Sequence, residues 1–278
     1  VGSQTLVLSG TGTITSKNVG SNKTVSVGTL ALADGSNGGL AANYTLSGGT
    51  HQLTVNQRPL NATLARQYDA STTAAGSTLS SFDALQGGEN LTMTGSGTAS
   101  SANVANSISM ASNGDLALAD GSGGSAGLAT NYSLNSTVIN ITQRVLNSSG
   151  SKTYDANTNA LASAITLSNL AGSETLAHSG TASTSSANAG TYTIGNLSGI
   201  SISSGTGTAS NYTLTGGTHS FSVNRRVISL SGTRLYDATT NATASDLSTQ
   251  TNLVGSQTLV LSGTGTITSK NVGSNKTV

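Results

Sequence analysis

The feature that most constrains this chain is a long internal repeat. Residues 1–25 (VGSQTLVLSGTGTITSKNVGSNKTV) recur unchanged as residues 254–278, so the sequence returns to its starting point at position 254. Self-similarity on this scale is the signature of tandem modules, each of which contacts mainly its neighbours. We therefore expect the segment to be one period, with a short overlap, of a longer array.

Three landmarks divide this period into three units of similar length. The first is Tyr-Asp-Ala, which stands at positions 68–70, 154–156 and 236–238. The second is Asn-Tyr, followed by Thr or Ser, then Leu, and later an arginine; the third is an asparagine that ends a Gly/Thr-rich stretch. The residues are Tyr68 and Asp69, Tyr154 and Asp155, Tyr236 and Asp237; Asn43 and Tyr44, Asn131 and Tyr132, Asn211 and Tyr212; Arg58, Arg144 and Arg226; Asn18, Asn103 and Asn188. Their order predicts a partial repeat at 1–58, complete repeats at 59–144 and 145–226, and a partial repeat at 227–278.

Composition excludes several classes of protein. The chain has no cysteine, which excludes a disulfide scaffold, a thiolate metal site and a thiol nucleophile. A net charge of +1, with 8% charged residues, argues against a nucleic-acid partner, which would need a basic patch. The sequence contains no apolar run long enough to predict a membrane span. No signal peptide is visible, and since the chain opens in mid-pattern we expect the export signal to lie outside this segment.

Apolar and polar residues alternate with a period of two through much of each unit. Residues 5–15, 90–99 and 220–225 follow this pattern, which is typical of half-buried strands. Gly-containing pairs such as Asp34-Gly35 and Asp120-Gly121 indicate turns between them. The pattern predicts an all-β fold with almost no helix: a tandem array of small β-sandwich (Ig-like) repeats of about 84 residues that form a rod. Glycines on the inward face predict either closely spaced sheets or bulged strands.

A right-handed β-helix with coils of about 20 residues shares this Gly/Thr/Asn-rich composition and is the alternative fold. The repeated unit contains no consistent sub-period of that length, which favours the tandem sandwich. The segments that join units, such as residues 56–60, contain no glycine, and this predicts stiff joints.

The Tyr-Asp-Ala landmark resembles the YDG repeats of large bacterial adhesins of the filamentous haemagglutinin-like exoprotein class. In each copy a basic residue (Arg66, Lys152 or Arg234) precedes it and a Thr/Asn-rich stretch follows it. The resemblance implies an extracellular location at the bacterial cell surface and a spacer or adhesive role. Alanine replaces the family's glycine in all three copies, so if that glycine serves a positive φ, we expect the turn here to adopt another geometry.

The repeated Tyr-Asp pairs are the first candidates for a chemical role. Their carboxylates could hold an ion or a partner, but a landmark present in every unit favours architecture: the tyrosine packs across the unit junction and the aspartate caps its own turn. Calcium at the Asp34 and Asp120 turns is a second hypothesis, weakened because the third unit has Ser204 there. His51, His178 and His219 lack convergent partners. We therefore assign no catalytic, cofactor-binding or metal-binding residue.

The sequence thus favours a structural role over catalysis. We expect a repeat of an extracellular fibre or adhesin stalk, whose partners are the neighbouring repeats of the same chain and, in a filament, other copies joined by a donated strand. The alternative is an adhesive module that binds carbohydrate or another surface, including ice. Exposed aromatic residues usually mark carbohydrate sites, and all but one of the seven tyrosines belong to the landmarks. An enzyme would need a cluster of polar residues outside the repeated pattern, and the sequence offers none.

Overall fold

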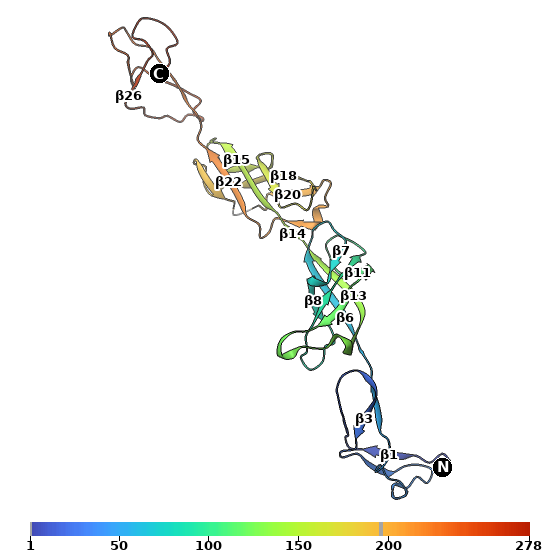
Figure 1. Cartoon of the computed structure of the whole chain (residues 1–278). Helices are drawn as coiled ribbons and strands as arrows, with labels where there is room; N and C mark the ends of the chain where they lie inside the picture. Colours follow the sequence, from blue (N-terminus) through green and yellow to red (C-terminus); the bar gives the residue numbers. More distant parts are fainter. Residues whose placement is uncertain (1, 195–196) are drawn as a thin grey trace. The chain divides into compact units, whose positions relative to one another are not determined.

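The computed structural model describes residues 2–194 and 197–278 and is all-β (Figure 1). Strand accounts for 45% of it, and no helix in the described part reaches seven residues, so the all-β prediction is confirmed. The only helical elements in that part are single 3₁₀ turns: η1 (Ala41–Asn43), η2 (Gly76–Thr78), η3 (Gly123–Ser125), η4 (Ala129–Asn131), η5 (Ala162–Ala164) and η6 (Ala209–Asn211). Within the described ranges, no helix has the length and apolar character needed to cross a membrane.

The chain divides into two compact units, residues 1–142 and 143–278. Most of unit 1 beyond residue 58 forms one six-stranded sheet in the order β7-β10-β11-β13-β6-β8, beside a two-stranded ladder of β12 and β9. These strands are β6 (Arg58–Gln67), β7 (Thr73–Ala75), β8 (Leu79–Phe82), β9 (Leu91–Thr94), β10 (Ser96–Ala99), β11 (Ala105–Ser112), β12 (Ala117–Asp120) and β13 (Tyr132–Thr142). The preceding residues form a β1-β4 ladder and a β2-β3-β5 sheet. Their strands are β1 (Leu6–Ser9), β2 (Thr13–Ile14), β3 (Gly20–Ser26), β4 (Ala31–Asp34) and β5 (Gln52–Val55).

Unit 2 repeats much of this plan. A four-stranded sheet, β17-β15-β22-β19, faces a three-stranded sheet, β16-β18-β20, through a shared apolar cluster. The strands are β14 (Arg144–Val145), β15 (Asn147–Thr153), β16 (Asn159–Leu161), β17 (Ile165–Ser168), β18 (Leu176–Ser183), β19 (Gly190–Thr193), β20 (Ile200–Ser204), β21 (Tyr212–Thr213) and β22 (His219–Asn224). Beyond residue 226 come two ladders, β23 with β25 and β24 with β26. These are β23 (Ser229–Ser231), β24 (Asn241–Thr243), β25 (Thr249–Thr251) and β26 (Thr264–Thr266).

The first and last strands of the residue 58–142 repeat are adjacent and parallel. The register of β6 and β13 runs through ten residue pairs, from Arg58–Tyr132 to Gln67–Thr142, and Figure 1 shows the two strands side by side. The same arrangement recurs in unit 2, where β14 pairs with β21 and β15 with β22. The neighbouring pairs in the same sheets are antiparallel. This pattern differs from a β-helix, in which successive coils stack in parallel.

The alternation of buried and exposed residues along the central strands shows where the core lies. Leu60, Leu64, Ile139 and Ile141 point inward from β6 and β13 and are at most 1% exposed. In β22, Phe221 and Val223 are buried while Ser220 and Ser222 are partly exposed. The predicted alternation is therefore present in these strands.

Two stretches predicted as single strands are each divided by a glycine. Residues 90–99 form β9 and β10, separated by Gly95 at φ +76°, and residues 5–15 form β1 and β2 on either side of Gly10 at φ +82°. A Cβ at Gly95 would lie 2.2 Å from the carbonyl oxygen of Asp115, so a side chain there would collide with backbone. At both places the glycine separates two strands that pair with different partners.

Candidate functional site: turns and junctions of the repeats

Each Tyr-Asp-Ala sequence forms the turn that follows the first strand of its repeat. In all three copies the aspartate accepts a hydrogen bond from the backbone N–H two residues later: Ser71 to Asp69 (2.9 Å), Asn157 to Asp155 (3.2 Å) and Thr239 to Asp237 (3.0 Å). This is the Asx-turn contact, in which an acidic side chain takes the place of a backbone acceptor. The three carboxylates are thus engaged within their own turns.

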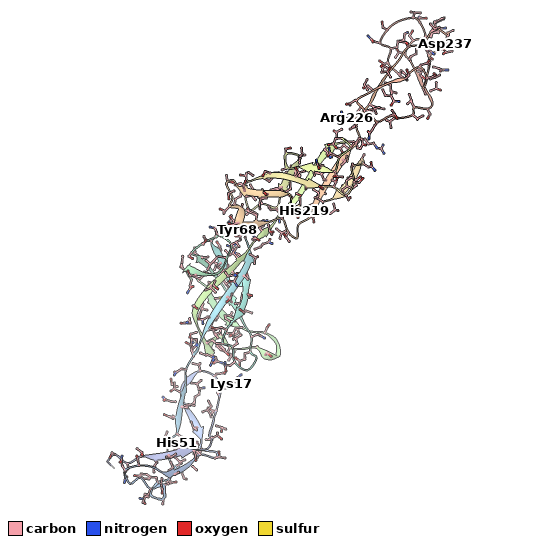
Figure 2. The ribbon with its side chains drawn as sticks, turned by 180° about the vertical axis from the view of Figure 1, so that it is seen from behind. Lys17, His51, Tyr68, His219, Arg226 and Asp237 are labelled. Atoms are coloured by element: carbon pink, nitrogen blue, oxygen red, sulfur yellow. The ribbon has the colours of Figure 1, made fainter. Side chains whose placement is uncertain are left out.

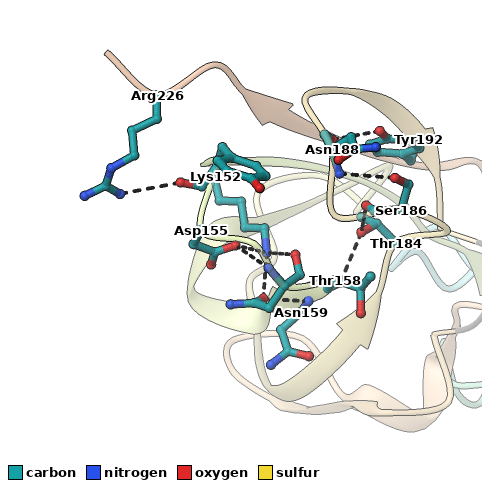
Figure 3. Close-up of polar contacts among 11 residues, drawn as sticks. Lys152, Asp155, Thr158, Asn159, Thr184, Ser186, Asn188, Tyr192 and Arg226 are labelled. Carbon is teal, nitrogen blue, oxygen red and sulfur yellow. Dashed lines mark hydrogen bonds and ion pairs between the residues drawn. The ribbon is translucent and has the colours of Figure 1, made fainter. Parts of the chain in front are cut away.

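The basic residue three positions before each aspartate closes the turn from the other side. Lys152 Nζ lies 2.8 Å from Asp155 Oδ1 and donates to the carbonyl oxygen and to Oδ1 of Asn157, both at 2.8 Å (Figure 3). Arg66 and Arg234 make the equivalent ion pairs with Asp69 and Asp237. The hydrogen bond from Lys152 is the main cause that lowers the pKa of Asp155 below its ordinary value.

The alanine of the motif keeps a left-handed backbone. Ala70, Ala156 and Ala238 have φ of +64°, +61° and +63°. The expectation that replacing glycine would change the turn geometry is therefore wrong. The aspartate and the basic residue hold the turn closed, and this offsets the strain that a Cβ carries at positive φ.

In the first two copies the tyrosine of the motif directly follows the first long strand of its repeat, β6 or β15. The backbone N–H of Tyr68 donates to Thr142 O, and that of Tyr154 to Asn224 O, both at 2.9 Å. Each bond extends the parallel ladder by one step beyond the assigned strands. Tyr68, labelled in Figure 2, is only 3% exposed, whereas Tyr236 is 59% exposed.

In unit 2 the Tyr154 side chain reaches the residues that follow the complete repeat. Its hydroxyl oxygen accepts a hydrogen bond from Gln257 Nε2 at 2.7 Å. Its carbonyl oxygen accepts from Arg226 Nη1 at 3.4 Å, which Figure 3 also shows. At this copy the landmark tyrosine therefore lies between successive parts of the array.

Unit 1 contains a junction between residues 1–57 and the repeat that follows. Val19 N–H donates to Asn131 Oδ1 at 2.9 Å, and Asn131 Nδ2 donates to Asn18 Oδ1 at 3.0 Å. Gln57 Nε2 donates to the Thr130 carbonyl at 3.2 Å. Two sequence landmarks, the asparagine that ends a Gly/Thr-rich stretch and the Asn-Tyr pair, therefore bind each other.

A charged bridge completes this junction. Lys17 Nζ lies 2.6 Å from Glu89 Oε1, while the buried Tyr132 donates its hydroxyl proton to Glu89 Oε2 at 2.8 Å. These two donors, Lys17 first, lower the pKa of Glu89. The same contact raises the pKa of Lys17, and burial is the main cause that raises the pKa of Tyr132.

Glu89 was missed by the sequence analysis. It occupies the place of Glu174, where Tyr212 likewise donates its hydroxyl proton to the carboxylate, and of Gln4, whose Oε1 accepts from Tyr44 at 2.9 Å. A signal was present, because an acidic or amide residue stands at this place in each unit. The alternation between Glu and Gln obscured it.

The landmark arginines anchor one loop in each repeat. Arg58 Nε donates to Ala84 O at 2.8 Å, Arg144 Nε to Asn169 O at 2.6 Å, and Arg226 Nε to Asn252 O at 2.7 Å. The three acceptors lie in the loops that follow β8, β17 and β25. Each arginine therefore holds the beginning of its repeat against a loop of the same repeat.

The other candidate side chains are engaged in backbone contacts. Asp34 and Asp120 accept N–H groups of Ala41 and Ala129 at 2.7 Å, and Ser204 Oγ accepts that of Ala209 at 3.0 Å. The serine of the third unit thus makes the bond that the aspartates make in the other two. In the described part of the chain no three His, Asp or Glu side chains cluster as metal ligands would.

The three histidines likewise bind carbonyl groups. His219 Nε2 lies 2.8 Å from Leu214 O, and because a carbonyl only accepts, this nitrogen carries the proton. The Nδ1 of His219 lies 2.9 Å from the hydroxyl oxygen of Ser148. His51 Nε2 contacts Leu46 O, and His178 Nε2 contacts the carbonyls of Ala162 and Ile165.

Unit 2 also has a hollow of about 550 Å³ beside Tyr154, bordered by Arg226, Leu253 and Leu259.

Comparison with known proteins gives one family. The model of the YDG domain family matches residues 1–54, 140–219 and 224–278. No curated protein sequence and no solved structure matches the chain.

Proposed function

The chain belongs to the YDG domain family, and from this premise we propose that it is a structural segment of an extracellular bacterial fibre or adhesin stalk of the filamentous haemagglutinin-like kind. Its repeats act as spacers that hold an adhesive region away from the cell, and they have no catalytic role. In this proposal small β-sandwich repeats follow one another in tandem as a rod.

One observation carries the proposal. In the residue 58–142 repeat, the strand by which the chain enters and the strand by which it leaves are parallel neighbours. The entry at Arg58 and the exit at Thr142 therefore lie at opposite ends of the ladder. A module with this arrangement adds length along its strands each time it is repeated, which is what a spacer needs.

The chemistry of the landmarks supports the same conclusion. The residues that recur in every unit hold turns and junctions together: Asp69 and its counterparts cap turns, and Asn131 binds Asn18 and Val19. Polar and charged groups that are committed to such contacts are not arranged around a substrate. The function that they support is the spacing and fixing of repeats.

Removal of one repeat tests the spacer role in solution. A variant that lacks residues 59–144 joins Arg58 to Val145, which reproduces the native Arg144–Val145 junction. If repeats extend end to end, small-angle scattering should show a maximum dimension shorter by ~30 Å, since ten paired residues at ~3.3 Å span that length. An unchanged maximum dimension would mean that repeats pack side by side, and the spacer proposal would fail.

The location is tested on cells. Antibodies raised against this chain should label intact cells of the bacterium that produces it, and protease treatment of whole cells should remove the label. If the protein is found in the lysate but never at the surface, the stalk proposal is wrong. Specific binding of the isolated chain to a glycan array would favour an adhesive module instead.

A further inference from the structure

The parallel ladder in the residue 58–142 repeat joins the two strands through which tension would pass. The preceding chain is attached to β6 at Arg58, and the following chain is attached to β13 at Thr142. These two residues belong to the first and last of the ten pairs in the register. A pull on the chain therefore acts on adjacent strands at opposite ends of their shared ladder.

Such a pull slides the strands past each other instead of peeling them apart. In this shear geometry the interstrand hydrogen bonds extend together, so several must break at once. When force is applied to both strands at the same end, the bonds break one after another, so each step must overcome only one hydrogen bond. The same ladder is consequently much stronger against one direction of force than against the other.

The packing beneath the ladder favours this role. Leu60, Leu64, Ile139 and Ile141 lie under it and are at most 1% exposed, which keeps water from the bonds on that side. In unit 2 the equivalent ladder has two pairs between β14 and β21 and six between β15 and β22. Phe221, fully buried, lies beneath that second ladder.

The Tyr-Asp-Ala turn closes the far end of each ladder. Tyr68 N–H bonds Thr142 O at the exit of the repeat, and the next residues turn away under the ion pair of Arg66 with Asp69. We propose that the β6–β13 ladder and its β15–β22 counterpart are the mechanical clamps of this chain, and that the Tyr-Asp-Ala turns beginning at Tyr68 and Tyr154 fix the ends of these two clamps. This inference rests on the proposed stalk function, because it assumes that tension passes along the chain.

Single-molecule force spectroscopy on the full chain tests the clamp directly. The chain has no cysteine, so handles can be attached at chosen pairs of introduced thiols. Pro59→Cys with Thr142→Cys loads the ladder in shear, whereas Gln67→Cys with Thr142→Cys loads two paired residues at the same end. All three positions are exposed. At ~3.6 Å per residue, and after subtraction of the distance between the two thiols in the folded chain, both pairs release ~265 Å of chain on unfolding. The rupture events of the two pairs are therefore directly comparable.

We expect the shear pair to rupture at a force at least twofold higher than the same-end pair at equal pulling speed. Urea unfolding of each variant without handles should give matching midpoints, which separates loading direction from stability. If a variant fails to fold, Ser149→Cys with Asn224→Cys and Thr153→Cys with Asn224→Cys repeat the comparison in unit 2. Equal rupture forces, or a weaker shear pair, would overturn the clamp. That outcome would leave the spacer role intact, whereas an unchanged dimension on repeat removal would end the spacer role whatever the rupture forces.

Discussion

Replacement of Ala70 by glycine should stabilise the repeat that contains it. Ala70 has φ +64°, a conformation that L-residues adopt at a cost, and it is exposed, so loss of its methyl group gives up little packing. The hydrogen bond from Ser71 N–H to Asp69 Oδ1 involves no atom of the Ala70 side chain. Ala70→Gly therefore removes strain and leaves the turn's contacts in place.

The magnitude follows from two opposing effects. An alanine in the left-handed region costs about 1–2 kcal/mol. Glycine adds about 0.5–1 kcal/mol of conformational entropy to the unfolded chain. The difference predicts a gain of about 0.5–1 kcal/mol, or roughly 2–8 °C in the melting temperature of a domain of this size.

Thermal and urea unfolding followed by circular dichroism would measure this gain, with hydrogen exchange of the Tyr68 amide as a local readout. The matched control is Ala65→Gly, because Ala65 is also exposed but lies in β6 with ordinary strand geometry. The control should lose about 0.5–1 kcal/mol. If both variants were destabilised by the same amount, the strain attributed to Ala70 would be refuted.

Three further predictions concern the core, the junction and a loop. Phe221→Ala, which empties a fully buried position, should cost about 3–5 kcal/mol in urea unfolding, and a loss below about 1 kcal/mol would contradict the packing described. Lys17→Ala should raise the pKa of Glu89 in an NMR titration, because Lys17 is the main cause that lowers it. Since this pKa is lower in the folded than in the unfolded chain, the contact stabilises the junction at pH values above the unfolded-state pKa, and its contribution is lost as the pH falls through the folded-state pKa. An unchanged pKa of Glu89 in the variant would exclude the bridge. Asp120→Ala should lose about 1 kcal/mol with its backbone contact while Asp120→Ser loses less, as Ser204 illustrates, and equal losses would contradict this equivalence.

The sequence was sufficient for the features that depend on local pattern. Alternation identified the faces of β22, where Phe221 and Val223 are buried. It did not show that Gly10 and Gly95 break their strands, because a glycine on the apolar face fits the period of two whether the strand continues or bends. Nor could it separate an alanine that follows ordinary geometry from one held at positive φ by Asp69 and Arg66.

Pairing between distant strands could not be read from alternation. Arg58 and Tyr132 lie far apart in the sequence, and nothing in either strand's own residues states that they are neighbours or that they run in parallel. The contact between Asn18 and Asn131 was equally hidden, although both residues had been singled out as landmarks. Repetition indicates which residues matter to the array, but only the three-dimensional arrangement shows which of them meet.

The join between repeats nevertheless contained a usable constraint. Val55 ends β5 and Arg58 begins β6, so only two residues separate the last strand before the join from the first strand after it. With so short a connection the next repeat starts where the previous one ends. In the residue 58–142 repeat, the parallel strands β6 and β13 release the chain at the end opposite to where it entered, whereas an antiparallel pair would bring it back to its starting end. The parallel pairing of β6 and β13 thus accounts both for the position of the exit and for the shear geometry of the ladder.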